Sequence, residues 1–390
     1  MLSLDLLRKE PELTRDALAR RGEQHPIDKI LATDQKRRTL ISQADSLRAT
    51  RNEVSKTISH MKGSRTELIA EMRQVGERIS TLDQELKSTE ETLDSMLLDL
   101  PNLPGKDVPD GSNDADNVVI RTVQSPRIFD FDPMPHWDIG ERLGILDFQR
   151  GVKLSGSRFY ILLGQGAALE RALINFMLDF HTQQHGYLET QVPAVVRKEI
   201  MVGSGNLPKF DDNLYHDEED DLWLIPTGEV PLTNLHRDEI LNAGTLPLCY
   251  IANTPCFRRE KAAAGKDTRG MKRVHQFNKV ELYKFVEPES SNVELEKLLK
   301  DAEKICQLLE VPYRVVKLCA PELGFASAES YDLEMWAPGS SEWLEVSSCS
   351  NCTDFQARRA NVKYRPKKGA APVFVHTLNG SALALPRVLI

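Results

Sequence analysis

The chain has 390 residues, 28% of them charged and 41% hydrophobic, with a formal net charge of −8. This composition indicates a globular protein of two or three domains, and its net acidity excludes indiscriminate nucleic-acid binding, although a local basic stripe can still bind a polyanion. The N-terminus carries Asp5 after four residues and no run of 18 apolar residues occurs, so the sequence predicts neither a signal peptide nor a membrane span.

The first hundred residues predict helices. Residues 1–22 have the pattern of a short amphipathic helix that ends at Gly22. From about residue 28 to residue 100, apolar residues recur at steps of three and four, with a break at Gly63 and Ser64. This pattern predicts two long helices that pack antiparallel in the manner of a coiled coil. A hairpin of this length has too little neighbouring core to form a globular domain, so we expect it to project as an arm.

The two predicted arm helices differ in charge. The first has a surplus of basic residues, and the second is rich in Glu and Asp. One interpretation is a solvated coiled coil with cross-helix ion pairs; the other is that the basic helix binds a phosphate backbone while the acidic helix faces away. The basic residues considered for phosphate binding are Arg37, Arg38, Arg48, Arg51 and Lys56.

Proline, glycine and aspartate dominate residues 101–117, which predicts a linker and the main domain boundary. Beyond it, short β-like segments such as 313–317 and 344–347 alternate with helical stretches such as 168–181 and 292–309. This alternation predicts an α+β domain with an antiparallel sheet flanked by helices.

Two polar features come first in this second part of the chain. Pro193 stands alone in an apolar segment, which is typical of an edge strand. Thr227, Gly228 and Glu229 follow another apolar segment. Thr227 and Glu229 share a face and together could accept and orient an ammonium group, whereas the alternative interpretation is a simple turn at the end of a strand.

Residues 254–285 predict a β-hairpin with a long loop. Arg258, Arg259 and Glu260 stand near the end of its first strand, and Glu281 lies on the returning strand. An Arg two residues before a Glu on a strand shares its face. The guanidinium can bind a phosphate in a forked geometry while the carboxylate accepts from a base or an amine. The alternative is a surface hairpin with a salt bridge.

Two further motifs follow towards the C-terminus. Glu345-Val346-Ser347-Ser348 alternates a carboxylate with hydroxyls, which can bind Mg²⁺ through oxygen ligands; the alternative is the polar face of an edge strand. Asn379 and Ser381 are polar groups on a backbone kept slim by small residues, and Arg387 follows where a helix would begin. The set contains no nucleophile, so the chemistry that fits it depends on electrostatics and positioning.

The six cysteines are sparse in a long chain, which predicts reduced thiols and a cytoplasmic location. Cys349 and Cys352 form a CxxC motif. No second CxxC or histidine pair accompanies it, so we expect no structural zinc site.

These motifs together resemble the bacterial-type seryl-tRNA synthetases, a family of class II aminoacyl-tRNA synthetases. The segment around Pro193 resembles class II motif 1, Phe257 to Glu281 resembles motif 2, and Asn379 to Arg387 resembles motif 3. The Thr-Gly-Glu segment resembles the family's serine-pocket motif, and the heptad hairpin resembles its tRNA arm. The resemblance covers the whole chain and implies a class II sheet core, a homodimer and ligation of L-serine to tRNA(Ser), and also to tRNA(Sec), at the expense of ATP.

The resemblance also implies roles for individual residues. Arg258 would bind the ATP α-phosphate, Glu260 the adenine side and Arg387 the γ-phosphate, and Pro193 would lie at the dimer interface. The other residues implied in ATP binding are Arg259, Val274, Glu345, Val346, Ser347 and Ser348, of which Glu345 and Ser348 would also bind Mg²⁺. The residues implied in serine binding are Thr227, Gly228, Glu229, Glu281, Asn379 and Ser381.

The chain departs from the family pattern at several positions. Arg259 replaces the usual Ser, Gly228 the usual Ala, Glu329 a frequent Lys, and Leu385 and Pro386 replace small residues before Arg387.

The resemblance implies a tRNA-binding domain at residues 1–104 with an arm at about 28–100, a linker at 105–117 and a catalytic domain at 118–390. The chain ends at Ile390, whereas in the family the motif 3 helix and a tail continue, so we expect a truncated sequence or a weakly active protein. Two alternatives stay open. One is a paralogue that transfers an activated amino acid to an acceptor other than tRNA, and the other is an inactive scaffold that works through its coiled coil.

Overall fold

The structure is a computed structural model that describes residues 1–60, 66–261 and 269–390. The predicted break at Gly63 and Ser64 and the small-residue part of the 254–285 loop lie outside these residues. The chain forms two compact units: one contains Leu2–Asp16 and Gln24–Leu100, and the other contains Met1, Ala17–Glu23 and Pro101–Ile390. In the described residues, no helix combines the length and the apolar character needed to cross a membrane.

The N-terminal segment forms two helices, α1 (Leu4–Lys9) and α2 (Pro11–Ala19), where the sequence pattern predicted one. The chain breaks at Glu10, whose φ of −134° is not helical. Pro11 explains the break, because proline lacks the N–H that would continue α1 but fits the first turn of a new helix.

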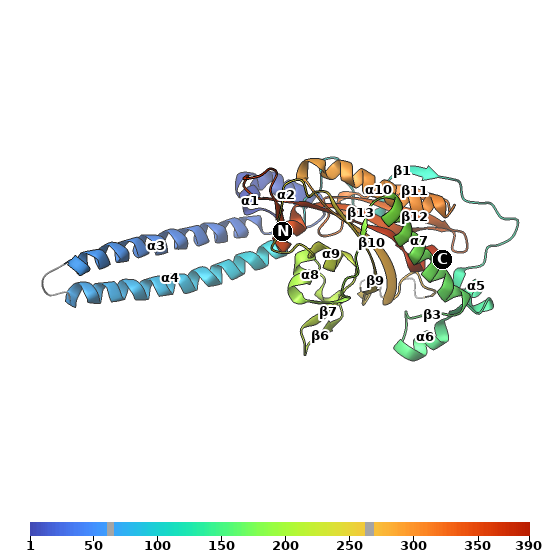
Figure 1. Ribbon diagram of the computed structural model, residues 1–390, viewed down its shortest axis with the longest axis horizontal. Coiled ribbons are helices and arrows are strands. Elements are labelled where there is room, and N and C mark those ends of the chain that lie inside the picture. The colour runs from blue at the N-terminus through green and yellow to red at the C-terminus, as the bar shows by residue number, and fades with distance from the viewer. Residues whose placement is uncertain (61–65, 262–268) are drawn as a thin grey trace. The chain divides into compact units, whose positions relative to one another are not determined.

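The predicted helical hairpin is confirmed in α3 (Ile27–His60) and α4 (Thr66–Leu98), which run side by side (Figure 1). Leu40, Ala44 and Leu82 form the buried centre of their contact. The heptad spacing produces this seam because it returns apolar side chains to the same face of each helix.

Cross-helix ion pairs join α3 to α4, as the first interpretation of the charge pattern predicted. The Nζ of Lys36 lies 2.8 Å from Glu85, and the Arg48 guanidinium lies 2.6 Å from Asp83. Arg37 and Arg38 both contact Asp34 on their own helix. Arg51 and Lys56, further along α3, form no ion pair within the described part of the chain, and both are exposed.

The second unit is built on an eight-stranded sheet in the order β1-β11-β12-β13-β16-β10-β9-β4. All neighbours are antiparallel except β4 and β9. The expected α+β fold with an antiparallel core is confirmed. The strands of this sheet are β1 (Val118–Val123), β4 (Leu188–Glu189), β9 (Leu248–Phe257), β10 (Gln276–Val286), β11 (Tyr313–Lys317), β12 (Glu329–Ala337), β13 (Glu342–Thr353) and β16 (His376–Ala384).

Helices and small sheets surround this core. The long helix α10 (Ser291–Leu308) packs against β16 and β13, and α7 (Gln165–Gln184) packs against β9 (Figure 1). The other helices are α5 (His136–Arg142), α6 (Phe148–Ser155), α8 (Lys198–Ser204), α9 (Glu229–Thr233), α11 (Phe355–Ala360) and α12 (Leu385–Leu389). The small sheets contain β2 (Leu146–Asp147) and β3 (Ile161–Leu162); β5 (Val195–Arg197), β6 (His216–Asp217) and β7 (Leu222–Leu224); and β8 (Ile240–Leu241), β14 (Lys363–Tyr364) and β15 (Val373–Phe374).

The segment predicted as a linker packs against the second unit. The N–H of Gly105 donates to the carbonyl of Ala328 at 2.8 Å, and Val108 is buried among Leu318, Ala320 and Leu323. The polar composition of this segment therefore describes its many turns and does not indicate a free tether.

Candidate active site

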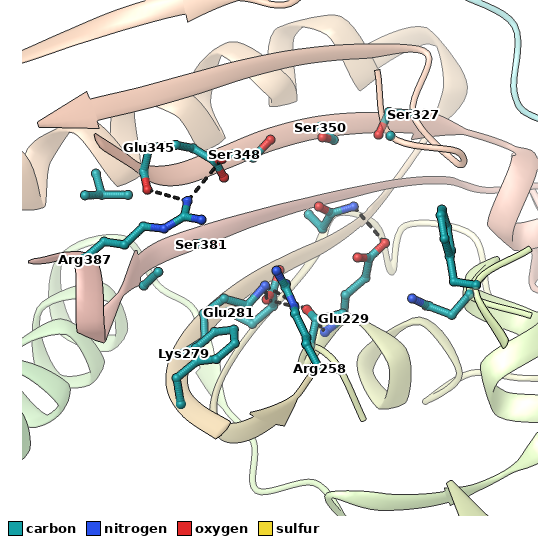
Figure 2. A pocket seen from close by; sticks show the side chains of 18 of the residues that line it. Glu229, Arg258, Lys279, Glu281, Ser327, Glu345, Ser348, Ser350, Ser381 and Arg387 are labelled. Atoms are coloured by element: carbon teal, nitrogen blue, oxygen red, sulfur yellow. Dashed lines mark hydrogen bonds and ion pairs between the residues drawn. The ribbon is translucent and has the colours of Figure 1, made fainter. Parts of the chain in front are cut away.

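A cavity of about 300 Å³ lies in the second unit between the hairpin β9–β10, the strands β13 and β16, and the loop 324–327 (Figure 2). Thirteen of the side chains singled out from the sequence line it. They are Thr227, Glu229, Arg258, Glu260, Val274, Glu281, Glu345, Val346, Ser348, Asn379, Ser381, Pro386 and Arg387. Residues separated by up to 160 positions in the sequence thus meet at one place.

The β9–β10 hairpin forms as predicted, but Arg258 and Glu260 do not share the face of a strand. Strand β9 ends at Phe257, and Glu260 has a φ of +50° in the loop that follows. Arg258 still reaches the cavity, because its Nε donates to the carbonyl of Pro226 at 3.2 Å and its guanidinium lies over the ring of Phe277. The loop backbone, and not strand alternation, brings both side chains to the cavity.

A buried polar triad lies on the floor of the cavity. The Nζ of Lys279 is 2.5 Å from Oε2 of Glu281 and 2.8 Å from Oγ1 of Thr227, which itself donates to Glu281 at 2.9 Å. Lys279 and Glu281 point the same way because they are two residues apart on β10. The lysine balances the charge of Glu281 and fixes its orientation.

Glu229 faces the same space from the first turn of the short helix α9. One carboxylate oxygen accepts from Nε2 of Gln356 at 2.5 Å and from Nδ2 of Asn379 at 3.1 Å. Burial, together with the negative charge of Glu281, raises the pKa of Glu229 to about 7, and Lys279 only partly offsets this. A carboxylate in this environment favours a cationic ligand, which would supply the missing positive charge.

Glu345 and Arg387 form an ion pair on the opposite side of the cavity (Figure 2). The Arg387 guanidinium lies 3.2 Å from the Glu345 carboxylate and donates to its backbone carbonyl at 2.8 Å. Desolvation acts to raise the pKa of Glu345, but the charges of Arg387 and Arg258 outweigh it and the pKa is lowered. Glu345 is therefore held as an anion between two arginines.

Asp332 lies behind this pair, opposite Ser348 in the pairing of β12 with β13. Burial, and next to it the charge of Glu345, raises the pKa of Asp332 well above its usual value. Its Oδ1 has no hydrogen-bond partner among the described residues. Carboxylate and hydroxyl oxygens are the donors that Mg²⁺ prefers, and an orphaned buried oxygen beside them is consistent with a cation at this place. No cluster of three His, Cys, Asp or Glu side chains suited to a metal occurs in the ranges that the structure describes.

Four residues singled out from the sequence lie away from the cavity surface. Arg259 is exposed and its guanidinium lies over the ring of Tyr215. Gly228 lies behind the surface, where an added Cβ would be 3.1 Å from that of Glu281. Ser347 is buried and donates to the carbonyl of Ser381 at 2.6 Å. Pro193 is exposed in the connection between β4 and β5.

The sequence reasoning missed several residues that line the cavity, chiefly Lys279, Lys272, Ser350 and the loop 324–327. Lys279 had a usable signal, because a charged residue two positions before Glu281 on one strand must share its face. The loop had none, since three of its four residues are apolar or glycine and its position follows from packing. Glu329, which departs from the family pattern, pairs with Lys317 at 2.7 Å.

The Glu345–Arg387 ion pair therefore lies across the cavity from Glu229 and Glu281 (Figure 2). Arg258 lies beside Glu229 and Glu281, and its charge acts on both Glu229 and Glu345. The end with Glu229 and Glu281 suits a small ligand with an ammonium and a hydrogen-bonding group. The space between Arg258 and Arg387 suits phosphates, because guanidinium groups bind phosphate oxygens in a forked geometry.

Comparisons with known proteins agree with this arrangement. Residues 209–390 match the model of the tRNA synthetase class II core domain (G, H, P, S and T), and residues 1–104 match that of the seryl-tRNA synthetase N-terminal domain. The serine–tRNA ligase of Thermomicrobium roseum is 57% identical over 392 residues, which cover all of this chain and 88% of the relative. That of Roseiflexus sp. is 57% identical over 393 residues, covering all of this chain and 92% of the relative.

The structure is also similar to a solved one. The seryl-tRNA synthetase from Pyrococcus horikoshii, solved in complex with ATP, is 40% identical and superimposes with a TM-score of 0.94 over all of this chain and 93% of that chain.

Proposed function

This chain belongs to the seryl-tRNA synthetase family of class II aminoacyl-tRNA synthetases, and we propose that its cavity activates L-serine with ATP before transfer to tRNA. The observation that carries the proposal is the distribution of charge in the cavity. The carboxylates Glu229 and Glu281 lie on one side with Arg258 beside them, and Arg387 lies on the other (Figure 2). Serine would bind with its ammonium and hydroxyl at Glu229 and Glu281. Its carboxylate would face the ATP phosphates, which would lie between Arg258 and Arg387.

Serine would bind through its ammonium group to Glu229 and through its hydroxyl to Glu281. Thr227 and Asn379 support these carboxylates, since the first donates to Glu281 and the second to Glu229. Ser381, opposite Glu281 in the pairing of β10 with β16, closes this part of the cavity. A site that is built to bond a hydroxyl rejects a ligand without one, because the buried polar groups would then stay unpaired.

ATP would bind with its phosphates at the arginines. Arg258 would hold the α-phosphate and Arg387 the γ-phosphate, while Val274 and the stem of Glu260 border the adenine side. Val274 is buried and Phe277 lies beneath the Arg258 guanidinium, so one face of the nucleotide site is apolar. Because Arg259 points to Tyr215, we do not assign it a role in binding ATP.

Mg²⁺ would be held by Glu345 and Ser348, whose oxygens fit its preference. When bound, it supplies positive charge to the phosphate oxygens. Arg387 would release Glu345 for this role, because phosphate offers the guanidinium a bidentate partner in place of the carboxylate.

The residues of the cavity act by orientation and charge. The serine carboxylate is already ionised near neutral pH, so it needs no general base to attack the α-phosphorus. Glu229 and Glu281 would orient it, and Arg258 would stabilise the negative charge that develops on the α-phosphate. The attack forms an acyl–phosphate bond and releases pyrophosphate. The terminal ribose hydroxyl of tRNA(Ser) then takes the seryl group and AMP leaves.

The arm would bind tRNA through α3. Arg51 and Lys56 are its best candidates, because Arg37, Arg38 and Arg48 already contact carboxylates of their own unit. In this scheme residues 1–104 form the tRNA-binding domain, residues 105–117 the connection and residues 118–390 the catalytic domain. On the family resemblance alone, we extend the proposal to tRNA(Sec) and to a cytoplasmic location.

We also propose a homodimer that involves the segment around Pro193. Large apolar side chains are exposed near it in the sequence: Leu188 is 62% exposed and Val195 is 45% exposed. A second copy would cover them, because isologous contacts bury the same patch on both partners. Sedimentation equilibrium tests this proposal, and a mass equal to one chain at micromolar concentration would contradict it.

Serine-dependent ATP–pyrophosphate exchange tests the central proposal. The full chain should exchange with L-serine, and kcat/KM for L-alanine should be lower by about 10⁴-fold because alanine lacks the hydroxyl. Charging of tRNA(Ser) and tRNA(Sec) transcripts should follow in the same preparation. A folded protein without serine-dependent exchange would contradict the assignment of the cavity.

A further inference from the structure

Arg21 is a buried arginine far from the cavity in sequence, and its side chain contacts only backbone carbonyls among the hydrogen bonds that the structure records. Its Nη1 donates to Asn102 and Ser327 at 3.1 Å each, and its Nη2 donates to Leu323 at 2.7 Å and Gly324 at 2.8 Å. Only 8% of the residue is exposed. Burying a guanidinium is costly, and burial lowers the pKa of Arg21 to about 10.

Three of the four carbonyls that Arg21 binds belong to one loop, residues 323–328. Gly324, Phe325, Ala326 and Ser327 of this loop line the cavity. Asn102 supports the loop from the same side, since its N–H donates to Phe325 at 2.9 Å and its Nδ2 donates to the carbonyl of Ala326 at 2.9 Å. Arg21 and Asn102 thus hold this loop through its backbone from behind.

Asn102, which Arg21 also binds, leads on to the side of the cavity that holds Glu229. Its Nδ2 donates to the carbonyl of Cys352 at 2.8 Å. The thiol of Cys352 accepts from Nδ2 of Asn379 at 3.5 Å, and the same Nδ2 donates to Glu229 at 3.1 Å. The contacts from Arg21 therefore end at the group that we assign to the serine ammonium, and none of the recorded contacts in this series reaches Arg258 or Arg387.

We propose that Arg21 is a positioning residue for serine: it fixes the loop 323–328 and, through Asn102 and Cys352, the place of Asn379 beside Glu229. This inference rests on the proposed function of the cavity. It gives a physical reason for a costly buried cation, because an arginine can satisfy several carbonyls of one loop at once. Lysine carries its three donors on a single nitrogen, so it cannot reach the same carbonyls in the forked geometry of a guanidinium.

Arg20 provides a matched control. It is the neighbouring residue and also binds backbone carbonyls, those of Gly105 at 3.2 Å and Val108 at 2.5 Å, together with Asp110 at 2.6 Å. Its partners lie in the segment 105–110 and not in the cavity loop. Arg20→Met removes a comparable number of contacts and one positive charge, but keeps the contacts that Arg21 and Asn102 make with the loop 323–328.

The test compares Arg21→Met, Arg21→Lys and Arg20→Met with the unmodified protein in pyrophosphate exchange. Arg21→Met should raise KM for serine about tenfold, since charge-assisted hydrogen bonds to the loop are lost, while KM for ATP changes less than about twofold. KM for serine of Arg21→Lys should lie between the values of Arg21→Met and the unmodified protein. Arg20→Met should leave KM for serine and KM for ATP near those of the unmodified protein. An unchanged KM for serine in folded Arg21→Met, or an equal rise in Arg20→Met, would overturn the proposal.

Hydrogen–deuterium exchange supplies a readout that does not depend on catalysis. The amides of Ser327 and Ala328 donate to Gly324 and Asn351, so a loosened loop should exchange them faster in Arg21→Met but not in Arg20→Met. If the unmodified chain shows no serine-dependent exchange, the proposed function fails. If it is active and the loop amides of Arg21→Met keep their protection, the role of Arg21 fails alone.

Discussion

Glu229 and Glu281 reach one cavity from a helix and a strand, and burial together with the charge of Glu281 raises the pKa of Glu229 to about 7. Lys279 contacts Glu281 directly, at 2.5 Å, whereas among the described residues the carboxylate of Glu229 accepts only from the amide groups of Gln356 and Asn379. The negative charge of Glu281 is therefore balanced by Lys279, whereas that of Glu229 is not fully balanced. An ammonium ligand would complete the set, and this difference leads to the first two predictions.

Serine activation should depend on pH through Glu229. Only the ionised carboxylate attracts an ammonium, so kcat/KM for serine should fall about tenfold for each pH unit below 7 and reach a plateau above it. Pyrophosphate exchange between pH 5.5 and 8, with ATP saturating, measures this profile. KM for ATP serves as the control and should stay nearly constant. A flat serine profile between pH 6 and 7.5 would contradict the role of Glu229.

The same carboxyl should make the free protein less stable at alkaline pH. Folding raises the pKa of Glu229 from 4.5 to about 7, so the folded state favours the protonated form. The resulting stabilisation is complete below pH 4.5 and is lost as the pH rises through 7. The free energy of unfolding of Glu229→Gln, taken relative to that of the unmodified protein, should therefore rise by up to about 3 kcal/mol between pH 4.5 and 8. The same variant should lose serine activation. Urea unfolding of both proteins at pH 4.5 and at pH 8 tests this prediction. An equal difference between their free energies of unfolding at the two pH values would contradict it.

Arg258 and Arg259 are neighbours that should differ sharply in function. Arg258 lines the cavity, and Arg259 lies over Tyr215 outside it. Arg258→Gln should lower kcat of pyrophosphate exchange by about 10²–10³-fold, because a charge that stabilises the transition state is removed. Arg259→Gln should stay within about threefold of the unmodified rate by the same reasoning. Equal losses in the two variants would show that the general positive charge of the loop matters, and not the placement of Arg258.

Removing the carboxylate of Glu345 should change the demand for Mg²⁺. We expect Glu345→Gln to raise the Mg²⁺ concentration for half-maximal exchange by about tenfold or more. Glu334→Gln is the matched control, because Glu334 lies opposite Glu345 in the pairing of β12 with β13 and binds Arg314. A magnesium titration at fixed ATP distinguishes them. Identical titration curves for both variants would argue against Glu345 as a ligand.

Reversing charge on α3 should weaken tRNA charging without affecting amino-acid activation. The double variant Arg51→Glu, Lys56→Glu should raise KM for tRNA(Ser), and each lost phosphate contact should lower the slope of log affinity against log salt by about 1. Lys87→Glu, an exposed position on α4, is the control and should have little effect. If pyrophosphate exchange falls in parallel with charging, the arm assignment is contradicted.

The sequence by itself determined the features that depend on local spacing. The heptad steps specified α3 and α4, since periodicity is a property of neighbouring residues. The alternation around Glu281 specified a hairpin, and strands β9 and β10 pair as expected. The motif residues were also recognisable from the sequence, because the chemical type of a side chain does not depend on where the fold places it.

Local spacing failed where the backbone departs from a regular element. Pro11 ends α1 inside a stretch that reads as one helix, and the end of β9 at Phe257 moves Arg258 and Glu260 off the strand. Arg259 has the same chemical type as Arg258, and nothing in its neighbourhood in the sequence indicates that it turns towards Tyr215.

Only the tertiary structure decided which charges meet and how deeply they are buried. Glu229, Glu281 and Glu345 come from different elements, and the pKa of Glu229 depends on their separation and on the loss of water around them. Arg21 meets the carbonyls of Leu323 and Gly324 across some 300 residues of sequence. A sequence pattern encodes local conformation, but electrostatic environment is a sum over groups brought together by packing. For that reason the motifs identified the family, while the balance of charge within the cavity and the support behind it emerged from the fold.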